Sequence, residues 1–377
     1  FSVDASYLGF FTSCYYLSYT LSLIFVGLLI DNIGPRIVLA CGAFICAGGS
    51  FVFSFSDSFL LACIARFFIG LGASCGFIGT LKIGSLWLPA NHMAKVVAFV
   101  YVSGMCGAIL GSKPLEICLN LWSWRTIYMV LGFVGLFISA LNYIAILPSK
   151  RSEKNFITMV KDSVESFYSV LSSVRVWVLS LYGMMMYVPL IVLGDFAGIS
   201  FIERRYGLSE VLSTNIFVWM YVGIILGTPF FAYISDAFKN RKIAMAFGAL
   251  FCLLSYSMVL YNDSISETWM RVFLFLAGFF FGAKSLGFTA IADIVVKKDS
   301  GLAAGLANTL VMGSGVLFLP LIGWLLQINK SQVVVNDMSV YTLTDFRMAL
   351  FLIPLVLFCA LIMTLFIKDT YPHTVKK

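Results

Sequence analysis

Charged residues are scarce in this 377-residue chain. Asp, Glu, Lys and Arg make up 11% of it, and hydrophobic residues make up 60%. Soluble globular proteins carry roughly 25% charged residues, so this composition excludes a soluble protein of this size. About 20 apolar residues cross a bilayer, which leaves room for roughly ten or more spans. The net charge of +7 does not indicate a nucleic-acid partner, because basic residues of membrane proteins gather in cytosolic loops.

Metal ligands are also scarce. The chain has two histidines, and its nine cysteines are scattered through apolar runs without a Cys-x-x-Cys pair. This pattern argues against a disulfide framework and a zinc site, and the cysteines are expected to be small apolar helix residues. The sequence shows no nucleotide-binding glycine pattern, nucleophile–base set or metal cluster. We therefore expect neither an enzyme nor an ATP-driven pump, and no cofactor.

Apolar runs of bilayer-spanning length fill most of the chain. The first run is too long for the core of a signal peptide. A polar segment at 328–343 predicts an external loop. Eleven spans are predicted, at 5–30, 37–55, 59–86, 95–119, 124–147, 174–197, 213–234, 241–261, 268–295, 300–327 and 344–367.

A short polar stretch separates the first two apolar runs. Asp31 ends the first run, where the helix dipole disfavours an anion, so it is expected to pair with Arg36 or with the N-terminal end of another helix. Gly34 and Pro35 predict the turn, since proline fits the first turn of a helix. Gly27, one turn before Asp31, predicts that a neighbouring helix approaches closely at that level.

Three charged positions recur at one sequence offset. Each has a residue of the same type 205 positions later, which indicates a tandem duplication of a membrane-embedded half. In the second copy Ala232 and Lys239 replace Gly27 and Gly34, so tight packing is less expected there. The recurring pairs are Asp31 and Asp236, Arg36 and Arg241, and Arg66 and Arg271.

These residues resemble the signature of a known family. Gly27, Asp31, Gly34 and Arg36 match all four fixed positions of the G-x-x-x-D-x-x-G-x-R loop of the major facilitator superfamily. Residues 66–72 are similar to the R-x-x-x-G-x-G motif of that family's fourth helix. The resemblance implies an all-α integral membrane protein with two pseudo-symmetric six-helix halves. In that family the signature loop follows the second helix, so we expect twelve spans in the intact protein and eleven here, with the first helix missing.

The expected organisation has three parts. Residues 1–147 form the N-terminal helical half, 148–173 a cytosolic linker, and 174–377 the C-terminal helical half. Apolar residues at helical spacing in the linker predict an amphipathic helix on the inner leaflet, or alternatively a solvated linker helix. With the signature loop in the cytosol, fifteen Lys and Arg residues lie on that side and six on the other. The positive-inside rule then places the C-terminus in the cytosol.

Charges inside the apolar runs are the first candidates for function, because a bilayer makes them costly. Arg66 and Lys284 are predicted to face the substrate path, where a fixed cation attracts an anionic group or changes the proton affinity of a nearby acid. The alternative for Arg66 is that it reaches the membrane surface or binds carbonyls at a helix end. Arg271 is a further candidate, because the repeat places it at the depth of Arg66.

Two acids are candidates for a coupling proton or a gate. Asp195 lies between Pro189 and Gly198, in a segment that predicts a bent or unwound helix, and broken helices mark binding sites in transporters. Glu116 follows Lys113 and is either part of an external gate or a plain interfacial pair. Tyrosines at helical spacing more often pack than bind, but three are candidates for hydroxyl contacts to a polar substrate: Tyr19, Tyr182 and Tyr187.

The resemblance assigns the two repeated loops to conformational switching. In the family the first loop touches the start of the eleventh helix, here near 300–301, when the carrier is open outward. Such contacts need to differ between two states by only a few kcal/mol. The residues assigned to this switch are Gly27, Asp31, Gly34, Arg36, Asp236 and Arg241.

The combined pattern predicts an alternating-access secondary transporter in the inner (plasma) membrane. It is expected to import a small polar metabolite (an amino acid, dipeptide or organic acid) with protons, as a monomer. It is similar to phagosomal amino-acid transporters of intracellular bacteria and, more distantly, to lysosomal dipeptide carriers. One alternative is a proton-coupled exporter of a siderophore or drug, although Lys113 separates the Gly-Pro pair that such exporters carry in the fifth helix. The other alternative is a non-transporting membrane receptor.

Overall fold

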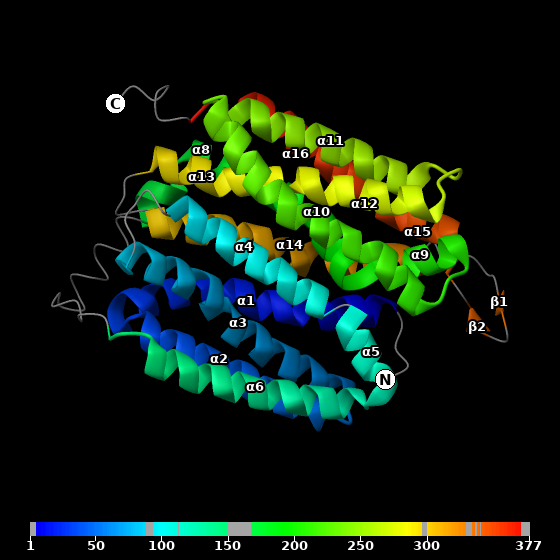
Figure 1. Ribbon diagram of the computed structural model, residues 1–377, viewed down its shortest axis with the longest axis horizontal. Helices are drawn as coiled ribbons and strands as arrows, with labels where there is room; N and C mark the ends of the chain where they lie inside the picture. The colour runs from blue at the N-terminus through cyan, green and yellow to red at the C-terminus, as the bar shows by residue number, and fades with distance from the viewer. Residues whose placement is uncertain are drawn as a thin grey trace.

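A bundle of long helices running side by side forms the molecule in the computed structural model (Figure 1). Its description covers residues 5–87, 93–111, 113–148, 167–295, 300–328, 334–335, 338–339 and 341–370. The predicted amphipathic helix of the linker lies almost entirely outside these residues.

Two sets of helices occupy opposite sides of the bundle (Figure 1). The first set is α1 (Ala5–Ile33), α2 (Pro35–Ser54), α3 (Phe59–Trp87), α4 (Met93–Leu110), α5 (Lys113–Leu121) and α6 (Trp124–Ala145). The second set is α8 (Val174–Val192), α9 (Gly198–Tyr206), α10 (Glu210–Ala237), α11 (Arg241–Tyr261), α12 (Glu267–Phe281), α13 (Ser285–Ile294), α14 (Ser300–Ile328), α15 (Leu343–Leu350) and α16 (Leu352–Phe366). Two short irregular helices complete it, the π-helical turn η2 (Leu193–Ala197) and the 3-10 turn η3 (Gly282–Lys284).

Most of the predicted spans appear as continuous helical segments. Nine helical segments among the described residues are long and apolar enough to cross a membrane. The predicted span 95–119 differs, because a turn at Gly111 divides it into α4 and α5. Pro114 lies in the first turn of α5, where its missing N–H donor is tolerated, and it favours restarting the helix over continuing it. The predicted external loop contains a small antiparallel pair, β1 (Val334–Val335) with β2 (Met338–Ser339), which the polar composition did not predict.

Local capping residues determine where several helices begin. Gly34 precedes α2 with a φ of 90°, and Pro35 takes the first helical position, as the sequence predicts. The side chain of Asn240 accepts a hydrogen bond from the backbone N–H of Ile243 at the start of α11. Such caps satisfy backbone donors that have no partner inside the helix.

Small residues bring α10 and α12 into backbone contact. A Cβ atom added at Gly223, Gly227 or Gly278 would lie 2.0–2.1 Å from a backbone oxygen of the other helix. Gly282 of η3 packs in the same way against Gly227. Close backbone approach of this kind is how helices associate inside a membrane. It holds the turn that carries Lys284 against the centre of the bundle.

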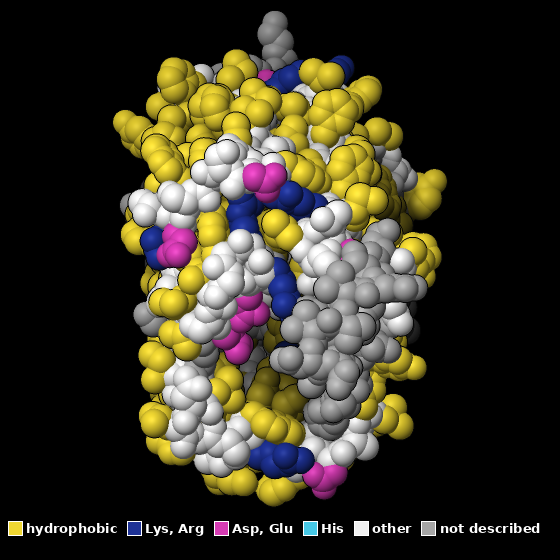
Figure 2. All heavy atoms as spheres, turned by 90° about the vertical axis from the view of Figure 1, so that its right-hand side faces the viewer, with side chains coloured by type: hydrophobic (Ala, Val, Ile, Leu, Met, Phe, Trp, Pro, Cys, Tyr) yellow, Lys and Arg dark blue, Asp and Glu magenta, His cyan; other side chains and the backbone are white. Residues whose placement is uncertain are grey.

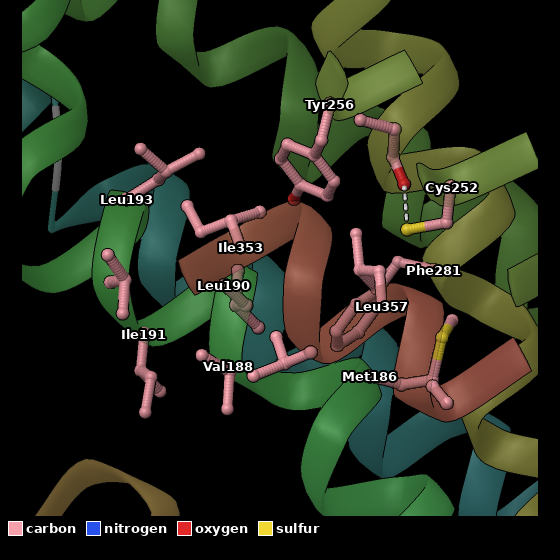
Figure 3. Packing of buried hydrophobic residues seen from close by; sticks show 14 of the residues in the cluster. Met186, Val188, Leu190, Ile191, Leu193, Cys252, Tyr256, Phe281, Ile353 and Leu357 are labelled. Atoms are coloured by element: carbon pink, nitrogen blue, oxygen red, sulfur yellow. Dashed lines mark hydrogen bonds between the residues drawn. The ribbon is translucent and has the colours of Figure 1, made fainter. Parts of the chain in front are cut away.

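The second set of helices surrounds a dense apolar core. Figure 3 shows part of it, with Met186 of α8, Tyr256 of α11, Phe281 of α12 and Leu357 of α16 directed toward one another. Cys252 donates its thiol to a backbone carbonyl of α12, at 3.6 Å. This packing makes the second set a firm support for the side chains that point toward the first.

The two sets meet along two seams. On one, α1 packs against α14: Gly9 faces the backbone of Leu319, and Gly315 faces the ring of Tyr16. On the other, α4 lies against α10. Figure 2 shows the end of the bundle that carries α9 and α15, where charged side chains gather near the middle and hydrophobic side chains surround them. An apolar perimeter around a polar end suits a bundle embedded in lipid.

Candidate functional site

Lys284 lies deep in the bundle and is 1% exposed. The 3-10 turn η3 interrupts the segment from α12 to α13 at this point, and such interruptions often occur at functional hinges. Four aromatic rings surround the ammonium, which suits a cation–π site. The distances from Nζ to the ring centroids are 4.2 Å for Tyr187, 5.3 Å for Tyr101, 5.6 Å for Phe288 and 5.8 Å for Phe281.

The hydrogen-bonding capacity of Lys284 is mostly unused. Its Nζ donates to the hydroxyl of Tyr101 at 3.4 Å, which is a long bond for an ammonium that has three donors. Among the described residues, no Asp or Glu forms an ion pair with it. Tyr101 belongs to α4, so this bond also joins the two helix sets. The ammonium therefore has donors left for an anionic ligand.

Asp195 lies at the second contact between the helix sets. It belongs to η2, between Pro189 and Gly198, so the predicted irregular segment is present as a π-helical turn. Tyr16 of α1 donates its hydroxyl to the Asp195 carboxylate. Asp195 keeps accessible surface as a residue, although protein atoms surround its carboxylate. A carboxylate within a predicted span is costly without a partner or water, so Asp195 is a candidate for exchanging a proton.

Arg66 of α3 is close enough to Asp195 to act on it electrostatically. Its guanidinium stacks on the ring of Phe11, 5.0 Å from the centroid. Its Nε is buried without a hydrogen-bond partner. An unsatisfied donor of this kind is rare in proteins and calls for a functional explanation. Arg66 therefore belongs with Asp195 rather than with Lys284.

The three predicted tyrosines have different surroundings. Tyr187 contacts Lys284 and forms part of the site. Tyr19 is buried and lies near the side chain of Asn308 on α14. Tyr182 is buried in the second helix set and donates to the backbone carbonyl of Met245 at 3.0 Å, which fits the packing alternative.

Two other predicted site residues lie apart from this group or cannot be placed. Arg271 pairs with Glu267 at 3.6 Å near the start of α12 and is about one third exposed. Lys284 follows it by thirteen residues, which is about 20 Å along a helix. The side chain of Glu116 lies outside the described residues.

The first repeated loop holds its arginine through an aromatic ring. Arg36 donates Nε to the backbone carbonyl of Tyr143 at 2.6 Å, and its guanidinium lies 4.3 Å from the centroid of that ring. The predicted close approach at Gly27 is wrong in this conformation, since an added Cβ would meet no atom within 4 Å. The side chains of Asp31 and of residues 300–301 lie outside the described part of the chain, so the predicted contact between them stays a prediction.

The second repeated loop holds its arginine with carboxylates. Arg241 donates Nε to Asp293 at 2.5 Å, lies 3.6 Å from Asp236, and offers its backbone N–H to Asp369 at 2.9 Å. The Arg241 side chain is 8% exposed. Asp236, the acid of the repeated loop, is one partner of Arg241, but Asp293 is the closer one.

Sequence reasoning missed Tyr16 and Tyr101. Each lies on the first helix set and bonds to a residue of the second. Tyr16 stands beside Tyr15 and Tyr19, and this cluster was the only sequence signal for it. Tyr101 had no signal, because its partner lies 183 positions away.

Comparison with known proteins agrees with this architecture. A family model for the Major Facilitator Superfamily matches residues 1–283 and 196–377. The probable galactarate/D-glucarate transporter GudP of Bacillus subtilis is 21% identical over 348 residues, which cover 81% of this chain and 74% of GudP. The multidrug resistance protein MdtL of Shewanella oneidensis is 23% identical over 350 residues, covering 90% of this chain and 84% of MdtL. A bacterial homolog of the human lysosomal transporter Spinster, solved in an inward-facing conformation, has the same fold, with a TM-score of 0.72 at 15% identity over 100% of this chain and 92% of that one.

Proposed function

The chain belongs to the Major Facilitator Superfamily, and we propose that it imports a small carboxylate-bearing metabolite together with protons. It is a multi-pass transporter, and the proposal adds an inner (plasma) membrane location, a cytosolic C-terminus and a monomeric state. Two separate groups divide the work. Lys284 binds the substrate, and Asp195 carries the proton.

The observation that carries the proposal is the environment of Lys284. A buried ammonium that lacks a carboxylate partner is costly, and it attracts an anionic group that enters its surroundings. A carboxylate accepts the donors that Tyr101 leaves unused. It also competes for the one hydrogen bond that joins Lys284 to α4. Substrate binding therefore weakens a contact between the two helix sets.

Protonation of Asp195 weakens a second contact between the two helix sets. As a carboxylate it accepts the hydroxyl of Tyr16 and joins η2 to α1. A protonated carboxyl is a weaker acceptor, so proton binding loosens this contact. Alternating access needs the two states to differ by only a few kcal/mol, which two weakened contacts can supply.

Uptake by proteoliposomes tests this division of labour. With an inward proton gradient, labelled 3-methylbutanoate, alanine and succinate are offered, and at least one accumulates. Lys284→Met lowers its uptake about tenfold or more, because a hydrogen bond to a charged group contributes about 1.5–3 kcal/mol. Lys242→Met, which removes a lysine bonded only to a backbone carbonyl of residue 365, leaves uptake unchanged. Asp195→Asn retains binding but abolishes the response to the proton gradient.

The exporter alternative rests on the similarity to MdtL. If tetraphenylphosphonium is extruded and Lys284→Met is tolerated, the chain is an exporter and the proposal is wrong. If an acid binds but no flux occurs under any gradient, the chain is a receptor. The similarity to GudP favours an acid as the substrate.

A further inference from the structure

A narrow hollow lies beside Lys284, between α8, α13 and α14. In this conformation its crevices are too narrow for a water molecule. Two glycines, Gly183 and Gly287, form part of its wall. The remaining wall is apolar apart from two polar side chains. Leu179, Phe288, Ile291 and Val311 are among the apolar residues, and Ser180 and Lys284 are the polar ones.

Within the described part of the chain, Ser180 has no hydrogen-bond partner, although it is only 1% exposed. A buried hydroxyl left in this state destabilises the fold by about 1–3 kcal/mol. It lines the same hollow as Lys284, which also has unused donors. Both residues line the hollow, and an O–H together with an ammonium can donate to the two oxygens of a carboxylate. The two donors therefore indicate that the hollow accepts the carboxylate end of a ligand.

The wall residues restrict the part of the ligand beyond its carboxylate. Apart from Ser180 and Lys284, they offer no side chain that accepts or donates a hydrogen bond. The hydroxyls of a sugar acid and the ammonium of an amino acid would lose their hydration there without replacement, which is strongly unfavourable. An aliphatic chain would instead bury apolar surface.

We propose that this hollow is the closed form of a seat for a short aliphatic monocarboxylate, held by Lys284 and Ser180. The inference rests on the proposed function and specifies its substrate class. The seat opens by a slight separation of α8 from α13 and α14, since the hollow is too narrow for a ligand in this conformation.

Stability and uptake measured together test the seat. The probe is 3-methylbutanoate, compared with leucine and galactarate. The probe should raise the thermal stability of the purified protein and be taken up, and the other two should do neither. Ser180→Ala should raise the stability of the ligand-free protein, because it removes an unsatisfied hydroxyl. The same variant should weaken binding of the probe about tenfold. A merely structural serine would not move these readouts in opposite directions.

Glycine variants test the size of the seat. A methyl group at Gly287 would lie 3.6 Å from the nearest atom, and one at Gly183 would lie 3.5 Å away, so both alanines fit the fold. Each should weaken 3-methylbutanoate binding more than acetate binding. Gly305→Ala, where no atom lies within 4 Å of the added methyl, is the matched control on α14.

The outcomes separate the two proposals. If no acid binds or is carried, the proposed function fails. If acids are carried in a Lys284-dependent way, but galactarate equals the aliphatic probe and Ser180→Ala has no effect, only the seat is overturned. If Gly287→Ala weakens acetate and 3-methylbutanoate equally, the hollow does not hold the aliphatic chain, and the inference is likewise wrong.

Discussion

The two repeated loops share a sequence pattern but hold their arginines differently. Arg36 of the first loop rests on the ring and backbone of Tyr143. Arg241 of the second loop is surrounded by carboxylates, with Asp293 as its closest partner. The position of Asp293 corresponds at the repeat offset to Leu88 in the first half, so the first half has no acid there. The same motif thus forms a stacked contact in one half and a charge cluster in the other.

The motif determines the backbone of each loop, whereas the surrounding helices determine the partners of its arginine. Both copies contain a residue of positive φ at this point, Gly34 at 90° and the corresponding Lys239 at 50°, although α2 begins directly after Gly34 and α11 begins one residue later, after Asn240. The partners of the two arginines differ between the copies, because they come from helices outside the motif. A loop stacked on a ring is released more readily than one held by charges. We therefore expect the first loop to move during transport and the second to stay fixed.

The largest expected effect comes from removing the arginines. Arg241→Gln leaves Asp293 and Asp236 without their cation, so it should lower the free energy of unfolding by about 3 kcal/mol. Arg36→Gln should cost about 1 kcal/mol, the scale of an accessible cation–π contact. Thermal unfolding in detergent measures both.

A double variant serves as the control for this prediction. Replacing Arg241 by Met and Asp293 by Leu removes the closest pair together, and it should recover part of the lost stability, since apolar replacement of a buried pair is often tolerated. Equal losses for Arg36→Gln and Arg241→Gln would mean that the two loops are held equally, and the contrast would disappear.

Several features of this molecule could be read from the sequence, for a clear physical reason. The apolar runs and the glycine–proline turn are local, and a charge inside a span is visible wherever it occurs, so Lys284 and Asp195 could be selected. Their partners could not be, because Tyr101 and Tyr16 reach them across the seam between helix sets. Arg271 shows a different limit. Its repeat offset matches Arg66, but Glu267 one turn earlier gives it a local partner.

The two halves also share an ion pair that the sequence did not reveal, because its residues are not separated by the offset of 205. Arg125 at the start of α6 pairs with Asp57 in the loop between α2 and α3, at 2.7 Å. Arg347 of α15 pairs with Asp263 in the loop between α11 and α12. The two pairs join corresponding elements of the two halves. The segments between them differ in length, so a fixed offset of 205 could not reveal the match.

A smaller effect on stability is expected from the residue of positive φ in each loop, Gly34 and Lys239. Lys239 adopts a left-handed conformation, which costs a residue with a side chain about 1 kcal/mol, whereas Gly34 adopts positive φ freely. Lys239→Gly should therefore raise stability by about 1 kcal/mol, and Gly34→Ala should lower it by a similar amount. Thermal unfolding of both variants checks this. If Lys239→Gly is destabilising, the lysine side chain contributes a contact that outweighs the strain.

The smallest expected effect is the acid response of the ion pair between Asp263 and Arg347. The hydrogen bond from Arg347 lowers the pKa of Asp263 below its ordinary value. A carboxyl with a lowered pKa stabilises the fold above its unfolded pKa of about 3.9, and this contribution is lost as the pH falls through the folded pKa. Wild type should therefore unfold at a slightly higher temperature than Asp263→Asn at pH 6, and the difference should shrink as the pH falls below about 4 and vanish below the folded pKa of Asp263. Because the carboxylate is exposed, high salt should also reduce the difference. A difference that persists in acid would show that Asp263 acts through neutral hydrogen bonding, which an asparagine at this position cannot reproduce.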